Sequence, residues 1–436
     1  MRRTLVITLL LLLSAFGTRA QFPDFFGFGL PEQPQQETTK LSFLYDANFE
    51  YLFDNREYDG SGGAYTSSMT INALRLSPVI GLGIESPGGV THKLMLGIDI
   101  RKNMGENPTQ EGDSDSWNWD MFQQITAWYQ FGMEKGNTRL DAYFGIIPRR
   151  LLQGEYNEAF ISDSLAFYRS NIEGPLFRIT RPRAVYELGL DWAGMIDEDR
   201  REQFHVFSYS KGLIAGDWLH AGWTFDLQHY ANTTLYKGVV DNILAEPYLQ
   251  AELGNKVGLQ QFTAKLSLLA GMQQDRRLDE GWNVPFGGRL VLSAMQWNIG
   301  LTNSLYVGTS LMPYYNDYDD GGNKYGSSLY WGNPFYRLHR YPGETDWDEL
   351  GVYDRIEAFW QPNIADGLKL RFSVVGHLVG DSEWFGFGGC QQKISLIFDL
   401  GEALHPKQRP APAARTPRKG KRHNDVVIDK DQRKYM

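Results

Sequence analysis

The feature that most constrains this chain is a strict alternation of apolar and polar side chains, repeated over about 360 residues. Residues 41–53 show it clearly, because successive side chains of a strand point to opposite sides. One face of that segment carries Leu41, Phe43, Tyr45, Ala47, Phe49, Tyr51 and Phe53, and the other carries Ser42, Asp46, Asn48 and Glu50. The pattern returns in residues 90–101, 117–133, 217–229 and 367–378. A helical period fits none of these segments, so the sequence predicts strands with one apolar face.

The connections between the expected strands alternate between short and long, which is typical of membrane barrels. Short turns are expected at 86–89, 134–138, 181–183, 212–216, 254–258, 300–303 and 362–367. Long loops are expected at 54–65, 102–116, 148–173, 193–201, 231–243, 273–286, 313–350 and 379–386. The count between them is about sixteen strands, with 14–18 possible and both ends on the short-turn side. Residues 174–216 fit only if a hairpin turn lies at Arg181-Pro182-Arg183.

An even strand number lets an antiparallel sheet close, and closure removes the unpaired edges that lipid does not tolerate. We therefore predict an all-β fold, a transmembrane antiparallel up-and-down β-barrel formed by residues 41–400. The mean hydropathy of −0.40 is compatible with it, because only alternate residues of each strand would face lipid. Aromatic residues make up 14% of the chain, as expected if aromatic belts line both membrane interfaces.

The first twenty residues have the layout of a secretory signal peptide. Arg2 and Arg3 precede an apolar run from Leu5 to Leu13, and small or polar residues lead to Ala20. The alternative, a membrane anchor, needs a longer apolar run. A cleaved signal peptide at residues 1–20 predicts export to a bacterial outer membrane. Residues 21–40 are expected to form an extended N-terminal arm, and residues 401–436 a disordered basic periplasmic tail.

Polar and charged residues on the non-lipid face are the candidate pore lining. They are Asp46, Glu50, Lys93, Asp99, Arg101, Glu187, Asp226, Glu252, Lys265, Arg355, Glu357, Lys369, Arg371 and Lys393. In a channel such residues tune the passage of ions and solutes. The alternative for each residue is a pair with a neighbouring strand that only stabilises the wall. Sixteen strands enclose a lumen wide enough for water.

Together these features predict a porin-like channel for passive diffusion of small hydrophilic solutes. Acidic segments at 106–115, 197–199 and 317–320 favour mild cation selectivity. The loop at 313–348 is rich in aromatic residues, so it either folds into the pore, stacks on sugar rings, or packs outside. The alternative function is a non-conducting outer-membrane surface protein, an adhesin or the partner of a surface complex. A barrel blocked by inward loops or by the 21–40 arm would favour that alternative.

Enzymatic and cofactor chemistry find no support in the sequence. None of the eight histidines has a catalytic or metal-binding spacing such as H-E-x-x-H. The segment at 317–322 lacks the ligand spacing of a calcium loop. The single cysteine, Cys390, excludes an intramolecular disulfide and is expected to be a small wall residue. We expect no enzyme activity, no cofactor and no metal.

The tail from residue 401 carries ten Lys or Arg and four Asp or Glu. Its expected partners are an anionic cell-wall polymer or an acidic periplasmic protein, and a tail without a partner is the alternative. Nucleic acid is excluded as a partner because the compartment is wrong. The remaining expected partners are outer-membrane lipid, the barrel-assembly machinery and the diffusing solutes.

Several phrases resemble a porin-like outer-membrane β-barrel family of Bacteroides-type bacteria. They are residues 162–168 with 171–174, residues 187–192 and residues 238–242. The resemblance covers most of residues 40–400 and implies an outer-membrane barrel without a catalytic motif. One departure concerns the chain end. Ile394, Leu396, Phe398 and Leu400 make a plausible last strand, but 36 residues follow where many such barrels stop.

Overall fold

The computed structural model describes residues 39–58, 65–105, 124–198, 200–231, 233–278, 281–318, 322, 326–338, 348–381 and 384–404. The expected signal peptide, the N-terminal arm up to residue 38 and the tail from residue 405 lie outside these residues. No helix within the described ranges has the length and apolar character needed to cross a bilayer.

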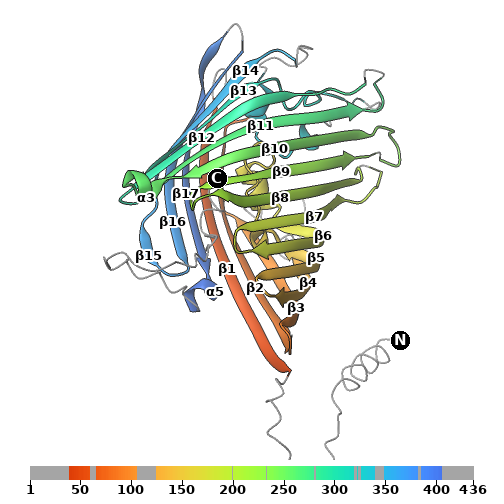
Figure 1. Cartoon of the computed structure of the whole chain (residues 1–436). Coiled ribbons are helices and arrows are strands. Elements are labelled where there is room, and N and C mark those ends of the chain that lie inside the picture. Colours follow the sequence, from red (N-terminus) through yellow and green to blue (C-terminus); the bar gives the residue numbers. More distant parts are fainter. Residues whose placement is uncertain are drawn as a thin grey trace, which may run out of the picture. The chain divides into compact units, whose positions relative to one another are not determined.

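The described strands form one antiparallel sheet that closes into a barrel (Figure 1). The strands are β1 Lys40–Glu57, β2 Met69–Ser86, β3 Val90–Asn103, β4 Gln124–Lys135, β5 Thr138–Pro148, β6 Asn171–Arg181, β7 Ala184–Gly194, β8 Gln203–Ala215, β9 Leu219–Tyr230, β10 Val240–Glu252, β11 Gln261–Asp275, β12 Phe286–Gln296, β13 Ile299–Gly308, β14 Gly351–Trp360, β15 Asn363–Ala365, β16 Leu368–Gly380 and β17 Phe385–Asp399. Each wall strand pairs with its chain neighbours, and β1 pairs with β17 to complete the ring.

The wall has sixteen strands, as the sequence predicts. The additional strand, β15, is a three-residue piece of the connection between β14 and β16 and pairs only with β16. Both β1 and β17 reach the end of the barrel that carries the short turns. The hairpin predicted at residues 181–183 is confirmed, because β6 ends at Arg181 and β7 begins at Ala184.

Two predicted connections are wrong. The β12–β13 turn lies at Trp297-Asn298 and not at 300–303. Both turn residues have a positive φ, 54° and 64°, which is the backbone that a two-residue hairpin turn requires. Gly300 lies inside β13, where an added Cβ would come within 2.2 Å of the Phe359 ring, so this glycine makes room for an aromatic side chain. The loop expected at 379–386 is short, because only residues 381–384 separate β16 from β17.

The predicted faces of the strands are confirmed. Leu41 is 67% exposed on the outside of the wall, whereas Asn48, on the other face of β1, is 1% exposed in the lumen. Outward apolar residues of other strands are also exposed, among them Leu94, Ile125, Trp223, Leu266, Leu301 and Val374. The outer face of the wall therefore carries the apolar side chains that the alternation predicts.

Within the described residues, the short helical segments lie in the connections between strands, except for α5, which follows β17. They are η3 Arg149–Leu151, α2 Asp163–Tyr168, α3 Gly254–Val257, α4 Gly326–Leu329, η4 Pro334–Arg337 and α5 Leu400–Leu404. Four of these, η3, α2, α4 and η4, belong to two long connections, residues 149–170 and 309–350. The described parts of both connections fold into the barrel and form the functional site.

Candidate functional site: a lumen crossed by two loops

The connection between β5 and β6, residues 149–170, follows the inside of the wall, and we call it the collar. In chain order it bonds to Glu187 of β7 (Gly154 N–H, 2.9 Å), Glu246 of β10 (Asn157 Nδ2, 2.6 Å), Arg355 of β14 (Glu158, 2.6 Å), Lys393 of β17 (Asp163) and Asp99 of β3 (Ser170). These strands come in their order round the barrel. The collar is therefore tied to the wall on almost every side.

Buried ion pairs make the strongest of these attachments. Arg355 lies 2.6 Å from Glu158 of the collar and 2.9 Å from Glu357 on its own strand. Glu357 also accepts from Arg371 of β16 at 2.7 Å. These side chains are at most 9% exposed, so each charge depends on its partner in place of water.

The two collar carboxyls respond differently to the lumen. Burial raises the pKa of Glu158, although Arg355 opposes the shift. Burial also disfavours the charged form of Asp163, but Lys393 and Arg355 outweigh it and hold the pKa of this carboxyl below its ordinary value. Asp163 therefore stays ionised to lower pH than Glu158 does.

The second loop fills the long-loop end of the lumen. Its described parts, residues 309–318 and 326–338, form what we call the aromatic layer. The layer residues that belong to one buried apolar cluster are Leu311, Met312, Tyr314, Leu329, Tyr330, Phe335, Tyr336 and Leu338. They pack with inward residues of the wall, among them Tyr58, Leu269, Tyr306 and Tyr353.

Hydrogen bonds and ring contacts fix the aromatic layer in place. Tyr330 donates to Gln273 of β11 at 2.7 Å, and the Phe335 ring stacks 4.7 Å from His377 of β16. The prediction that this loop folds into the pore is therefore confirmed for the described residues. The alternative, stacking on sugar rings, does not suit Tyr314, Tyr330, Trp331, Phe335 and Tyr336, because other protein groups already cover them.

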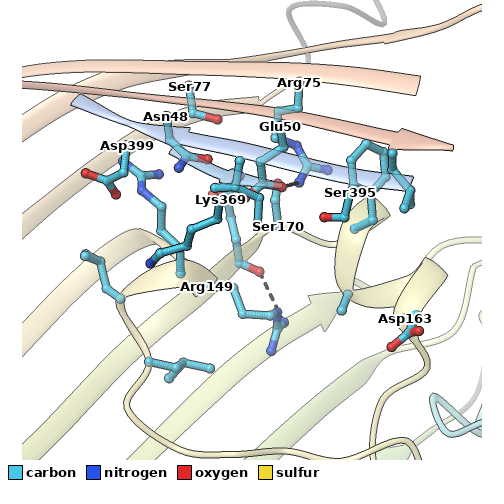
Figure 2. Close-up of a pocket in the computed structure, with 18 of the residues that line it drawn as sticks. Asn48, Glu50, Arg75, Ser77, Arg149, Asp163, Ser170, Lys369, Ser395 and Asp399 are labelled. Atoms are coloured by element: carbon cyan, nitrogen blue, oxygen red, sulfur yellow. Dashed lines mark hydrogen bonds and ion pairs between the residues drawn. The ribbon is translucent and has the colours of Figure 1, made fainter. Parts of the chain in front are cut away.

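A cavity of about 510 Å³ remains between the collar and the wall formed by β1, β2, β16 and β17 (Figure 2). Figure 2 shows Glu50 and Arg75 on the strand side and Arg149 and Asp163 on the collar side. The acidic lining residues are Asp46, Glu50, Asp99, Asp163, Glu357, Asp399 and Glu402. The basic ones are Arg75, Arg149, Arg150, Arg178, Lys369, Arg371 and Lys393. Seven of each sign leave the lining without net charge.

Half of the predicted pore-lining residues line this cavity: Asp46, Glu50, Asp99, Glu357, Lys369, Arg371 and Lys393. The other seven face inward but do not line it: Lys93, Arg101, Glu187, Asp226, Glu252, Lys265 and Arg355. Several of these are bonded to neighbouring strands, as in Glu187–Arg178 at 2.9 Å and Lys265–Glu246 at 3.1 Å. The contacts of these residues therefore fit the alternative interpretation, in which a charged residue pairs with a neighbouring strand and stabilises the wall.

The sequence pattern missed the collar's own contribution to the cavity. Arg149, Arg150 and Asp163 line it from a connection that has no strand periodicity. The available signal was composition, because this long connection carries several charges beside buried apolar residues such as Phe160 and Phe167.

The remaining candidate features fall partly outside the described residues. Asp197 and Glu198 are exposed in the β7–β8 connection, whereas 106–115 and 319–320 are not described. His205 lies 3.0 Å from Asp226 and its ring is 3.7 Å from the Trp331 ring, so it contributes to lumen packing. Within the described ranges, no three His, Cys, Asp or Glu side chains are placed to hold a metal ion.

Comparisons with solved structures find porins. A mutant porin of Rhodopseudomonas blastica is 12% identical to this chain in sequence, and the two structures give a TM-score of 0.38. The alignment covers 82% of this chain and 100% of that porin. A structure described as "Asymmetric conductivity of engineered proteins" gives the same identity, TM-score and coverage. No family model and no curated protein sequence matches the chain.

Proposed function

We propose that this protein is a porin-like channel of a bacterial outer membrane through which small hydrophilic solutes diffuse. The observation that carries the proposal is a cavity of about 510 Å³, lined by equal numbers of acidic and basic residues, inside a closed barrel whose outer surface is apolar. A polar interior of this kind holds water, and the charges lining it select among solutes.

The lining of the cavity favours the passage of polar solutes of either charge, and not of cations alone or anions alone. Its acidic and basic residues alternate around the space, as in Arg150, which lies 3.6 Å from Asp46, and Lys369, which lies 3.0 Å from Glu402. Mild cation selectivity remains part of the proposal, but its support comes from the acidic loop segments and not from this lining.

A second candidate function is favoured by the aromatic layer. A channel needs a continuous water path, and buried rings at the long-loop end leave little room for one. A non-conducting surface protein, an adhesin or the partner of a surface complex, would keep such a layer permanently in place. The two functions differ in whether the layer opens.

Single-channel recording of the refolded full chain in a planar bilayer tests both. Discrete current steps from the wild-type chain support the channel. Steps seen only in a Phe335→Ala, Tyr336→Ala variant support a barrel held closed by the aromatic layer, and no steps in either reject a conducting pore. Tyr318→Ala is the control, because Tyr318 lies at the end of a layer segment, is 59% exposed and does not belong to the buried cluster. Reversal potentials under a salt gradient then decide ion preference.

A further inference from the structure

The ladder between β6 and β7 is unusually short. Its pairs run only from Leu176–Gly189 to Arg181–Ala184, whereas β6 stays paired to β5 up to Asn171 and β7 stays paired to β8 up to Gly194. Residues 171–175 and 190–194 therefore face each other without a ladder, and we call this part of the wall the seam. Six residue pairs cover about 20 Å of strand, or about 15 Å of height at a tilt of about 40°, and the apolar band of a barrel is about 25 Å tall.

The local sequence explains why the ladder stops. Pro175 has no backbone N–H to donate at the first position of the seam. At the next position an added Cβ on Gly174 would come within 2.4 Å of the Leu190 carbonyl oxygen, so the strands are close together although they are not paired.

Side chains from β7 and from the collar bridge the seam where the backbone does not. Asp191 accepts from the Glu173 N–H at 3.0 Å and from Arg149 at 2.6 Å. Arg149 also donates to the Asn171 carbonyl at 3.3 Å, and Arg169 to the Ala193 carbonyl at 3.4 Å. In lipid these backbone groups need such partners. Breaking these side-chain bonds costs less free energy than separating a paired ladder, because only Arg149 and Arg169 have to move away from the seam.

The aromatic layer holds this closure from the inside. The Trp331 ring centroid lies 4.7 Å from the Arg169 guanidinium carbon and 5.6 Å from that of Arg149. Movement of the layer would therefore remove one contact from each arginine at the same time.

Apolar side chains lie on both sides of the seam. Outside, Trp192 of the seam is exposed on the outer face of the wall, and the exposed side chains of Phe177 and Leu188 lie beside it in the paired ladder. Inside, the lumen carries an apolar cluster of Val79, Met95, Trp128, Tyr143, Ile147, Ile172, Leu176 and Phe207. Its collar neighbours Leu151 and Leu152 line the charged cavity. A molecule that entered here would find an apolar surface first and the guanidinium groups of Arg149 and Arg150 next.

We propose that the seam is a lateral opening through which the acyl chain of an anionic amphiphile passes from the bilayer into the lumen. The chain would lie on the apolar cluster and the anionic head would reach Arg149 and Arg150. This route is separate from diffusion along the barrel axis and depends only on the barrel lying in a bilayer.

Photolabelling of the full-length barrel in lipid vesicles tests the opening. The probe is a phosphatidylglycerol with a diazirine in its acyl chain, and labelled residues are mapped by mass spectrometry. We expect adducts on the lumen side, at Ile172, Leu176 or Phe207, in addition to the outer face. Adducts confined to outward residues would overturn the proposal.

A staple across the seam provides the matched test. Glu173→Cys with Trp192→Cys, in a Cys390→Ser background, places two outward thiols on opposite sides of the seam for a bifunctional maleimide. The control staple joins Phe177→Cys and Leu188→Cys, which are paired in the ladder of the same two strands. We expect the seam staple to reduce lumen adducts at least fivefold and the control staple to leave them unchanged. Equal loss or equal retention in both would reject the seam as the route. Heat-modifiable migration on a gel checks folding, and single-channel conductance separates this result from the proposed diffusion.

Discussion

Glu158, which the collar carries into the lumen, lies 2.6 Å from Arg355 of β14. The two side chains are 9% and 8% exposed. The pair joins the collar to the strand on the far side of the lumen, so it couples the position of a loop to the wall.

Replacement of Glu158 by Gln should loosen the collar. Arg355 keeps Glu357 as a partner and still lies 4.0 Å from Asp163 of the collar, but it loses its closest contact with the collar. We therefore expect a loss of about 1–3 kcal/mol in the free energy of unfolding. Urea titration of the refolded barrel at about pH 4.5, where the contribution of Glu158 is present, measures it. The control is Asp197→Asn, which removes an exposed pair with Arg200 and should change stability by less than about 0.5 kcal/mol. A loss of equal size in both variants would contradict the role of the buried pair.

The opposite pKa shifts of the two collar carboxyls predict different pH dependences. The pKa of Glu158 is raised, so its contribution to stability is present below about pH 4.5 and is lost as the pH rises through its folded pKa. The pKa of Asp163 is lowered, so its contribution is present above about pH 4 and is lost only in stronger acid.

Stability curves between pH 3 and pH 8 measure this difference. The stability of the wild-type barrel relative to Glu158→Gln should fall as the pH rises above 4.5. Relative to Asp163→Asn it should stay constant from pH 5 to 8 and fall below about pH 4. Parallel curves for the two variants would show that the pKa values of Glu158 and Asp163 are not shifted in opposite directions.

Glu246 of β10 is a centre of the wall's charge network. Its carboxylate is fully buried and bonds to Lys265 at 3.1 Å, Arg289 at 3.2 Å and Asn157 of the collar at 2.6 Å. Glu246→Gln leaves two buried cations without their anion, so we expect a loss of about 3–5 kcal/mol in unfolding experiments. Lys256→Gln, at an exposed pair with Asp217, should leave stability nearly unchanged. A small effect of Glu246→Gln would mean that water reaches this part of the lumen.

The sequence predicted the barrel because strand periodicity is a local signal. The alternation of Leu41 and Ser42 along β1 is enough to assign which side of the wall each faces. The collar's contacts were not predictable in this way, because Asp163 and Lys393 are far apart in the chain and no period relates them. The positions of the turns are predictable only in part. Gly300 predicts a turn at 300–303, whereas the positive φ values of the turn fall on Trp297 and Asn298.

A pair of glycine substitutions tests the interpretation of Gly300. Gly300→Ala would place a Cβ within 2.2 Å of the Phe359 ring, so we expect a loss of about 1–3 kcal/mol from overpacking. Gly288→Ala, in the neighbouring strand β12, meets nothing within 4 Å and should be neutral or stabilising by about 0.4–1 kcal/mol. Thermal unfolding of both variants gives the comparison. Equal stability of the two would show that Phe359 moves aside freely.

The balanced charge of the cavity predicts that selectivity can be shifted in either direction. Lys369 and Arg150 face Glu402 and Asp46 near the short-turn end. The double variant Lys369→Gln, Arg150→Gln leaves the lining with a net negative charge. Its reversal potential should therefore move toward the value expected for a cation-selective pore. Asp46→Asn with Glu402→Gln should move it toward that of anions by a similar amount. Reversal potentials under a tenfold salt gradient measure both shifts, with Lys256→Gln outside the cavity as the control. The absence of a shift in both double variants would mean that ions pass the barrel by a path that avoids this cavity.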